Sequence, residues 1–275
     1  MQTQTIKLRD GRDMPRLGLG VWQTPDDGAA RVVSHALKNG YRHVDTAAAY
    51  NNEAGVGEGI RASGLDRGEV FLTTKVWNSD QGFDATLRAF EASSRRLGTD
   101  FVDLYLIHWP APKKGLYVET WKALIRLKQE GRAKSIGVSN FQPEHLERII
   151  GETGEVPVVN QVELHPTFQQ RPLRAFHAKH GIATESWSPL GRGSLLDDPV
   201  IGEIAKAHGR SPAQIIIRWN IQSDLIVIPK SATPSRIEEN ARVFDFELSP
   251  AQMAALDGLD RADGRVGPDP LTADF

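Results

Sequence analysis

Four polar residues of this chain have the types and positions that proton-transfer chemistry needs. Asp45, Lys75 and His108 each end a short apolar, β-prone segment, and Tyr50 lies five residues after Asp45. In a barrel of parallel strands, residues at the carboxyl ends of different strands converge on one face, where active sites are found. The positions therefore predict that a carboxylate, an ammonium, an imidazole and a phenol lie close together.

These side chains could form a general acid. A phenol has a pKa of about 10, and an ammonium within ~4–6 Å favours the phenolate and lowers that pKa. Lys75 could supply this charge to Tyr50, and Asp45 could hold Lys75 charged by ion pairing. His108 could donate a hydrogen bond to a substrate oxygen. Such a group protonates an oxyanion as it forms, which suits carbonyl reduction, enolisation or dehydration. Any one of these residues could be structural, but four at matching strand ends favour a site.

The elements that would position these residues form a regular repeat. Helix-like segments separate eight short apolar segments, which lie at 17–20, 41–45, 70–75, 102–108, 134–138, 157–163, 182–187 and 225–228. The segment Asp26–Asn39 has helical spacing, with Asp26 predicted as its N-cap and Gly40 as its stop. Pro143 and Pro212 are predicted to open later helices, because proline is tolerated in a first helical turn.

Alternating strands and helices indicate parallel pairing with right-handed crossovers. Eight such units predict an α/β fold of the (β/α)8 TIM-barrel type. An open, doubly wound sheet is the competing architecture, but no Gly-x-Gly-x-x-Gly follows the first strand. The glycine-rich segment 55–59 has a different spacing and indicates a helix start beside a loop.

Three pieces fall outside the repeat. Residues 5–16 predict a β-hairpin around an Asp-Gly turn, placed across the bottom of the barrel. Extra helices are predicted near 199–208 and 249–259, and a C-terminal tail follows them. No linker is visible, so residues 1–275 are predicted to form a single domain, of a size common among such barrels.

The composition excludes several classes of protein. The formal net charge of −2 implies no preference for nucleic acid or membranes, and the absence of cysteine excludes disulfides, thiolate metal sites and cysteine nucleophiles. The first residues are polar, without a signal-peptide core, and no stretch approaches the ~20 apolar residues of a membrane span. We expect a cytoplasmic protein. His177 and His180 lack the glutamate and third ligand of a zinc motif, so no metal is predicted.

Several segments carry a family resemblance. Gly40–Glu53 resembles the first signature of the aldo-keto reductase superfamily, Val102–Pro110 resembles its fourth-strand segment, and Ile228–Asn240 resembles its cofactor signature. Segments 137–140 and 159–166 resemble strand ends of the bacterial 2,5-diketo-D-gluconic acid reductase group. The resemblance spans the whole chain and implies a (β/α)8 barrel that reduces carbonyls with NADPH.

The resemblance also implies a role for each matching residue. Tyr50 would donate the proton, Asp45 and Lys75 would tune it, and His108 would orient the carbonyl. The matches to the cofactor groove are Trp187 for nicotinamide stacking; Ser139, Asn140 and Gln161 for the carboxamide; Ser188, Leu190 and Gly191 for the pyrophosphate; Lys230, Ser231 and Arg236 for the 2′-phosphate; and Glu239 and Asn240 for adenine. Two cations and a hydroxyl at the 2′-phosphate position favour NADPH over NADH.

Trp22, Trp77 and Trp109 follow the first, third and fourth strands and match the walls of the family's substrate pocket. Aromatic walls suit small apolar or amphipathic carbonyls, and the resemblance points to methylglyoxal or keto-sugar acids such as 2,5-diketo-D-gluconate. The tail 264–275 is predicted to form the last wall.

The family resemblance implies a monomer. The alternative is an NADPH-binding sensor or scaffold barrel with slow or no turnover, which the four intact catalytic positions disfavour. A dehydratase or isomerase is disfavoured by the cofactor signature.

Overall fold

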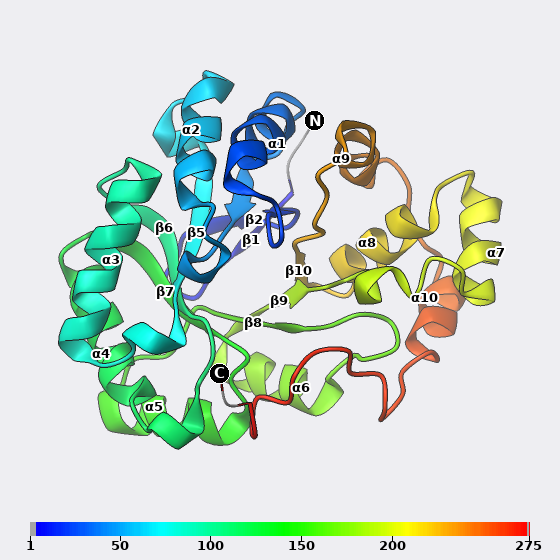
Figure 1. Cartoon of the computed structure of the whole chain (residues 1–275). Helices are drawn as coiled ribbons and strands as arrows, with labels where there is room; N and C mark the ends of the chain where they lie inside the picture. The colour runs from blue at the N-terminus through cyan, green and yellow to red at the C-terminus, as the bar shows by residue number, and fades with distance from the viewer. Residues whose placement is uncertain (1–3, 274) are drawn as a thin grey trace.

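The chain folds around eight parallel strands, with helices packed outside them (Figure 1). The computed structural model describes residues 4–273 and Phe275. The strands are β3 (Leu19–Gly20), β4 (His43–Asp45), β5 (Phe71–Val76), β6 (Val102–Ile107), β7 (Ala133–Ser139), β8 (Val159–Glu163), β9 (Ala183–Trp187) and β10 (Ile226–Val227), paired in chain order. Parallel bridges from Leu17 to Val227 and from Gly20 to Lys230 join the first strand to the last. The predicted barrel of α/β class is confirmed, with a strand in each of the eight expected segments.

Helices follow each strand and cover the outside of the barrel. In the described part of the chain they are α1 (Asp26–Lys38), α2 (Glu53–Ser63), α3 (Phe83–Leu97), α4 (Tyr117–Gln129), α5 (Pro143–Thr153), α6 (Arg171–His180), α7 (Pro199–His208), α8 (Pro212–Gln222), α9 (Pro234–Ala241) and α10 (Pro250–Asp257). The extra helices predicted near 199–208 and 249–259 are α7 and α10. Prolines open α5 and α8 as predicted.

The start of α1 is capped differently from the prediction. Pro25 is the N-cap, and Asp26 is the first helical residue and makes no capping bond. The Asp26 carboxylate instead accepts a hydrogen bond of 2.8 Å from the backbone N–H of Gly55 at the start of α2. A Cβ at Gly55 would clash with the backbone of Asp26. The glycines of α2 therefore allow close helix packing, and this tertiary contact takes the carboxylate away from its own helix.

The N-terminal hairpin closes one end of the barrel. Strands β1 (Thr5–Lys7) and β2 (Asp13–Pro15) pair antiparallel. Leu8 and Met14 pack with Leu104 and Leu106, which belong to the buried cluster inside the barrel. The alternate residues of β6 belong to the larger cluster that the helices share, so both faces of the strand are buried, as is usual in parallel barrels. The predicted hairpin is confirmed, while residues 1–3 lie outside the described part.

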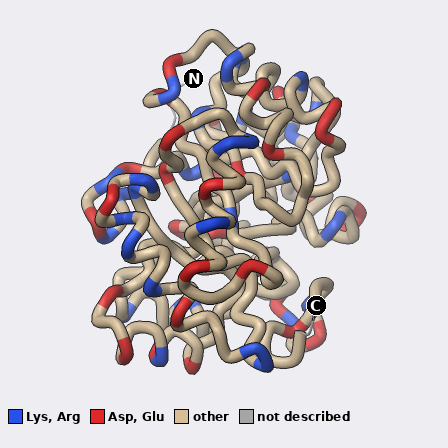
Figure 2. Tube along the Cα trace, turned by 60° about the vertical axis from the view of Figure 1, so that its left-hand side comes forward, with Lys and Arg blue, Asp and Glu red and all other residues tan. Residues whose placement is uncertain are grey.

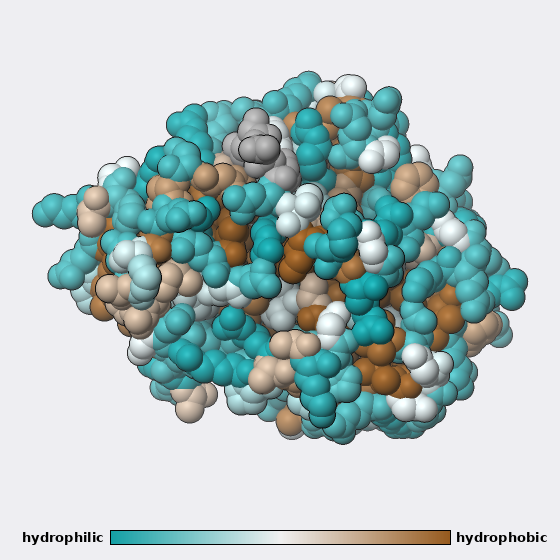
Figure 3. Space-filling view, turned by 180° about the vertical axis from the view of Figure 1, so that it is seen from behind, coloured by the Kyte–Doolittle hydropathy of each residue, from teal (hydrophilic) through white to brown (hydrophobic). Residues whose placement is uncertain are grey.

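Charged and apolar side chains are spread over the surface. Lys and Arg are intermingled with Asp and Glu over the trace (Figure 2), in keeping with 33 basic and 35 acidic residues. The face seen from behind is mostly hydrophilic with scattered apolar residues (Figure 3). Within residues 4–273, no helix has the length and apolar character to cross a bilayer.

Candidate active site

A cavity of about 750 Å³ is lined by residues at and beyond the carboxyl ends of the strands. The predicted site residues that line it are Asp45, Tyr50, His108, Ser139, Asn140, Gln161, Trp187, Ser188 and Lys230, together with Trp22, Trp77 and Trp109. The other predicted residues are not part of its lining: Lys75, Leu190, Gly191, Ser231, Arg236, Glu239 and Asn240. The barrel therefore brings most of the sequence-predicted site onto one surface.

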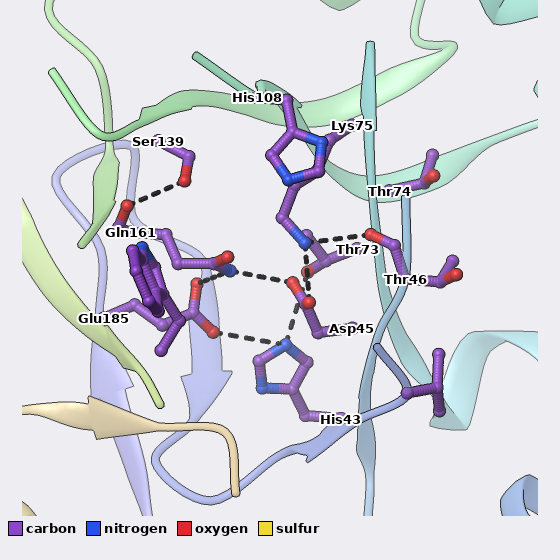
Figure 4. A network of polar contacts seen from close by, with 12 residues as sticks. His43, Asp45, Thr46, Thr73, Thr74, Lys75, His108, Ser139, Gln161 and Glu185 are labelled. Carbon is purple, nitrogen blue, oxygen red and sulfur yellow. Dashed lines mark hydrogen bonds and ion pairs between the residues drawn. The ribbon is translucent and has the colours of Figure 1, made fainter. Parts of the chain in front are cut away.

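A buried ion pair lies beneath the cavity (Figure 4). The Nζ atom of Lys75 on β5 lies 2.6 Å from Oδ1 of Asp45 on the neighbouring strand β4, and it also donates to the carbonyl of Thr46 at 3.0 Å. The same Nζ lies 5.2 Å from the centre of the Tyr50 ring. The Tyr50 ring in turn meets the His108 ring edge-on, with 5.5 Å between centroids. The four side chains named from the sequence thus form one connected group.

Burial and charge oppose each other in this group. Burial favours a neutral Lys75, but Asp45, Tyr50 and Glu185 together outweigh it and raise the pKa of Lys75. Burial raises the pKa of Tyr50, and the Lys75 charge offsets that rise only in part. Lys75 therefore acts on Tyr50 in the expected direction, but desolvation of the phenolate is the larger effect. Burial, helped by the Lys75 charge, lowers the pKa of His108 well below its usual value, so its imidazole is neutral.

A second buried carboxylate extends the network. The Gln161 amide nitrogen donates to Oδ2 of Asp45 and to Oε2 of Glu185, each at 2.8 Å (Figure 4). Its amide hydrogens point at two carboxyl groups, so the carbonyl oxygen of Gln161 is the atom left for a ligand. Burial and the nearby Asp45 charge raise the pKa of Glu185 to about 8. Glu185 was missed in the sequence, although an acidic residue in an apolar β-segment, just before Trp187, was a usable signal.

The orientation of the Trp187 ring is set by a hydrogen bond. Its Nε1 donates to Oδ1 of Asn140 at 2.8 Å, and Nδ2 of Asn140 donates to the backbone carbonyl of His108 at 3.0 Å. Asn140 has the left-handed φ of +64°, which turns its side chain across the strand ends. Ser139 ends β7 and donates its hydroxyl to the carbonyl of Gln161 at 2.8 Å. These residues form one rigid rim of the cavity.

Cations gather after the last strand. Lys230 follows β10 and lines the cavity with an exposed side chain, and Arg236 is exposed on α9. The Ser231 hydroxyl accepts from the backbone N–H of Thr233 at 3.2 Å, which shapes the turn before α9. The segment thus offers two solvated positive charges beside the start of a helix.

The remaining predicted cofactor residues have structural contacts. The backbone N–H of Gly191 donates to the carbonyl of Ser188 at 2.9 Å, and Leu190 packs against the core. The Glu239 carboxylate accepts from the Ser211 hydroxyl at the start of α8. Asn240 is buried on α9.

Aromatic side chains wall the cavity near His108. The Trp77 ring meets the His108 ring edge-on at 5.0 Å, and Phe275 stacks on Trp77 with 5.8 Å between centroids. Phe275 also meets the Trp109 ring edge-on at 5.1 Å. The tail predicted as the last wall therefore places Phe275 in the lining, while Asp274 lies outside the described residues.

Other residues of the lining were not foreseen in the sequence. The guanidinium of Arg192 lies 5.5 Å from the centre of the Trp22 ring, which joins the loop after β9 to the loop after β3. Asp80 and Arg96 also line the cavity. No spacing pattern marks them, because they reach the cavity through loop and helix geometry. Across the described residues, no three His, Asp or Glu side chains are placed to hold a metal ion.

Known proteins of similar sequence and structure share one family. A model of the aldo/keto reductase family matches residues 16–261. An aldo-keto reductase of Mycobacterium sp. (strain JLS) is 58% identical over 275 residues, covering 100% of this chain and 99% of that protein. Methylglyoxal reductase DkgA of Escherichia coli (strain K12) is 51% identical, covering 96% of each chain.

A solved structure is similar over its full length. The crystal structure of a mutant of the protein Gox0644 in complex with NADPH has a TM-score of 0.97 and 58% sequence identity, with 100% of both chains covered. The family match begins directly after the hairpin and ends after α10, and it includes Asp45, Tyr50, Lys75 and His108. This chain belongs to the aldo/keto reductase family.

Proposed function

We propose that this protein reduces aldehydes and ketones to alcohols, as an oxidoreductase of the EC 1.1.1 class that uses NADPH. The observation that carries the proposal is the Tyr50 phenol beside the Lys75–Asp45 ion pair and the neutral His108, at a cavity that Trp187 also lines. NADPH in the complex of the similar protein Gox0644 supports the choice of cofactor.

The residues of the cavity fit a nicotinamide dinucleotide. Trp187 offers an aromatic face whose orientation Asn140 holds, and Gln161 presents a carbonyl oxygen that can accept from a carboxamide. Lys230 and Arg236 suit a 2′-phosphate because both are cationic and solvated, and Arg binds phosphate in a bidentate manner. When bound, the reduced nicotinamide supplies a hydride to the carbonyl carbon.

The chain's own residues supply the proton. Negative charge develops on the carbonyl oxygen during reduction, and Tyr50 transfers its hydroxyl proton to that oxygen. The Lys75 charge stabilises the phenolate that remains, and Asp45 keeps Lys75 charged inside the barrel. A neutral His108 can donate one hydrogen bond to the same oxygen and so orient the carbonyl.

The walls of the cavity favour small carbonyls. Trp77, Trp109 and Phe275 narrow it with aromatic faces, and such walls exclude water from the reacting centre. We propose methylglyoxal and keto-sugar acids of the 2,5-diketo-D-gluconate type as substrates. The name of the E. coli relative, methylglyoxal reductase DkgA, supports the first of these.

The test is reduction of a panel of small carbonyls, followed by the loss of reduced-nicotinamide absorbance. The Tyr50→Phe variant removes the proton donor and should lower kcat/KM by about a hundredfold or more. Tyr117→Phe is the matched control, because Tyr117 is buried on α4 away from the cavity lining. Activity of Tyr50→Phe equal to that of Tyr117→Phe would contradict the proposal. Binding of NADPH without turnover of any carbonyl would favour the sensor or scaffold alternative.

The single-domain, cytoplasmic and monomeric character expected from the sequence stays a prediction. Light scattering behind a sizing column measures the molar mass in solution. A mass near 30.3 kDa would support the monomer.

A further inference from the structure

We propose that Glu163 positions the C-terminal wall of the substrate cavity and thereby helps to determine which carbonyls fit. Glu163 ends β8 and is not among the residues that line the cavity. It would act through the segment 264–268, and its kinetic consequences rest on the proposed carbonyl reduction.

The Glu163 carboxylate binds two successive backbone amides of the tail. Oε1 accepts from the N–H of Val266 at 2.5 Å, and Oε2 accepts from the N–H of Gly267 at 2.8 Å. Nε2 of His165 lies 3.2 Å from Oε1, and the Glu163 side chain is only 1% exposed. Burial opposes ionisation, but these donors outweigh it and lower the pKa of Glu163. A buried, ionised acceptor of this kind makes stronger hydrogen bonds than a neutral one.

These two hydrogen bonds place the tail against Trp187, the residue proposed to stack on the nicotinamide. An added Cβ at Gly267 would lie 2.5 Å from the Trp187 ring and 2.7 Å from Oε2 of Glu163. Only a glycine fits between the carboxylate and the ring. The next residue, Pro268, lines the cavity, and so does Phe275 further along the tail. The carboxylate therefore links the Trp187 side of the cavity to its substrate wall.

Other contacts hold the segment before this point. The guanidinium of Arg265 lies 4.6 Å from the centre of the Phe168 ring, and the N–H of Arg261 donates to the carbonyl of Thr167 at 3.2 Å. These contacts hold the chain up to residue 265. Among the described residues, Glu163 alone bonds the amides of 266 and 267.

Limited trypsin digestion tests the anchor without any need for activity. Trypsin cleaves after arginine, and the Arg265–Val266 bond contains the amide that Glu163 holds. Glu163→Gln keeps the shape of the side chain, but its amide has only one acceptor oxygen. Its N–H group then faces one of the two backbone N–H groups of the tail, with which it cannot form a hydrogen bond. Release of the peptide that begins at Val266, followed by mass spectrometry, should speed up about tenfold or more, the effect of losing one hydrogen bond to a charged group. Glu247→Gln is the control, because Glu247 is 84% exposed and pairs with Arg218.

Gly267→Ala gives the same test from the tail side, without changing a charge, and serves if Glu163→Gln does not fold. Its Cβ should displace the tail from Trp187 and speed the same cleavage. Cleavage of both variants at the wild-type rate would overturn the proposal, whether or not the protein reduces carbonyls.

Kinetics then separate a positioning role from a structural one. Glu163→Gln should lower KM for bulky carbonyls about tenfold, because a displaced wall leaves the cavity wider. The kcat for methylglyoxal should change by less than about twofold, because the reacting groups are untouched. Phe275→Ala removes the wall itself, so Glu163→Gln should have little further effect on KM in that background. Additive effects on KM in the double variant would contradict action through the tail.

Discussion

Replacing Asp45 with asparagine should leave the buried positive charge of Lys75 without its counter-ion. The Lys75 and Asp45 side chains are 0% and 2% exposed, and their charged atoms lie 2.6 Å apart. Asparagine preserves the shape at 45 and can still accept a hydrogen bond, but it removes the negative charge. Lys75 would keep the carbonyl of Thr46 as an acceptor, at 3.0 Å. Most of the loss is therefore electrostatic.

The size of the effect follows from the burial of the pair. Removing one partner of a buried ion pair costs about 3–5 kcal/mol, against a total stability of about 5–15 kcal/mol for a typical protein. The pKa of Lys75 should fall below its unfolded value in Asp45→Asn, because burial lowers it and Asp45 is the largest of the contributions that oppose burial. Between a lowered folded pKa and the unfolded pKa of lysine, the unfolded chain binds one proton more than the folded protein. The loss of stability in Asp45→Asn should therefore shrink as the pH rises toward the unfolded pKa of lysine.

Urea unfolding at neutral and alkaline pH measures this loss. Asp45→Asn should lower the free energy of unfolding with little change in the m-value. The double variant Asp45→Asn/Lys75→Met has no unpaired buried charge, so much of the stability should return. A loss below about 1 kcal/mol for Asp45→Asn, the range of exposed pairs, would refute the assignment of this pair to the barrel interior.

Three further predictions concern charge at the site. Lys75→Met should raise the pKa of the alkaline limb of the rate profile, because Lys75 opposes the rise that burial causes in the pKa of Tyr50; an unchanged profile would argue against this role. The double variant Lys230→Ala/Arg236→Ala should lower the preference for NADPH, measured as kcat/KM with NADPH divided by kcat/KM with NADH, at least about tenfold. If the wild-type protein already has a ratio of one or less, these cations do not select the 2′-phosphate. The pKa of Glu185 rises from 4.5 unfolded to about 8 folded, so its stabilising contribution is complete below pH 4.5 and is lost as the pH rises to about 8. The free energy of thermal unfolding of the wild type, minus that of Glu185→Gln, should fall over this pH range. A constant difference would mean that Glu185 is ionised in the folded protein throughout the range.

The sequence alone was enough to predict the barrel and most of the residues that the structure gathers at one cavity. Strand ends at Asp45, Lys75 and His108 could be located because a buried parallel strand is a continuous apolar segment. Turn and helix-end signals at glycine and proline separated the repeats. The family signatures then named the residues around the cofactor groove. Each of these inferences uses residues close together in the chain.

Contacts between distant segments depended on the tertiary structure. Asp26 binds the start of α2 instead of its own helix, although a local capping signal was present. Glu185 is the register partner of Gln161 on β8, whereas Asp45 of β4 reaches the same amide only because the sheet closes into a barrel. Burial then raises the pKa of Glu185.

The C-terminal wall of the cavity is the clearest case of what the sequence does not determine. Glu163 and Val266 are 103 residues apart, and the tail between 264 and 275 has neither helical nor strand periodicity. Along its path two backbone amides bind one buried carboxylate, Nδ2 of Asn78 donates to the carbonyl of Phe275, and the Phe275 ring stacks on Trp77. The residue types therefore predict proton donation to a carbonyl, whereas the shape of the cavity beside them arises only when the folded barrel gives the tail its partners.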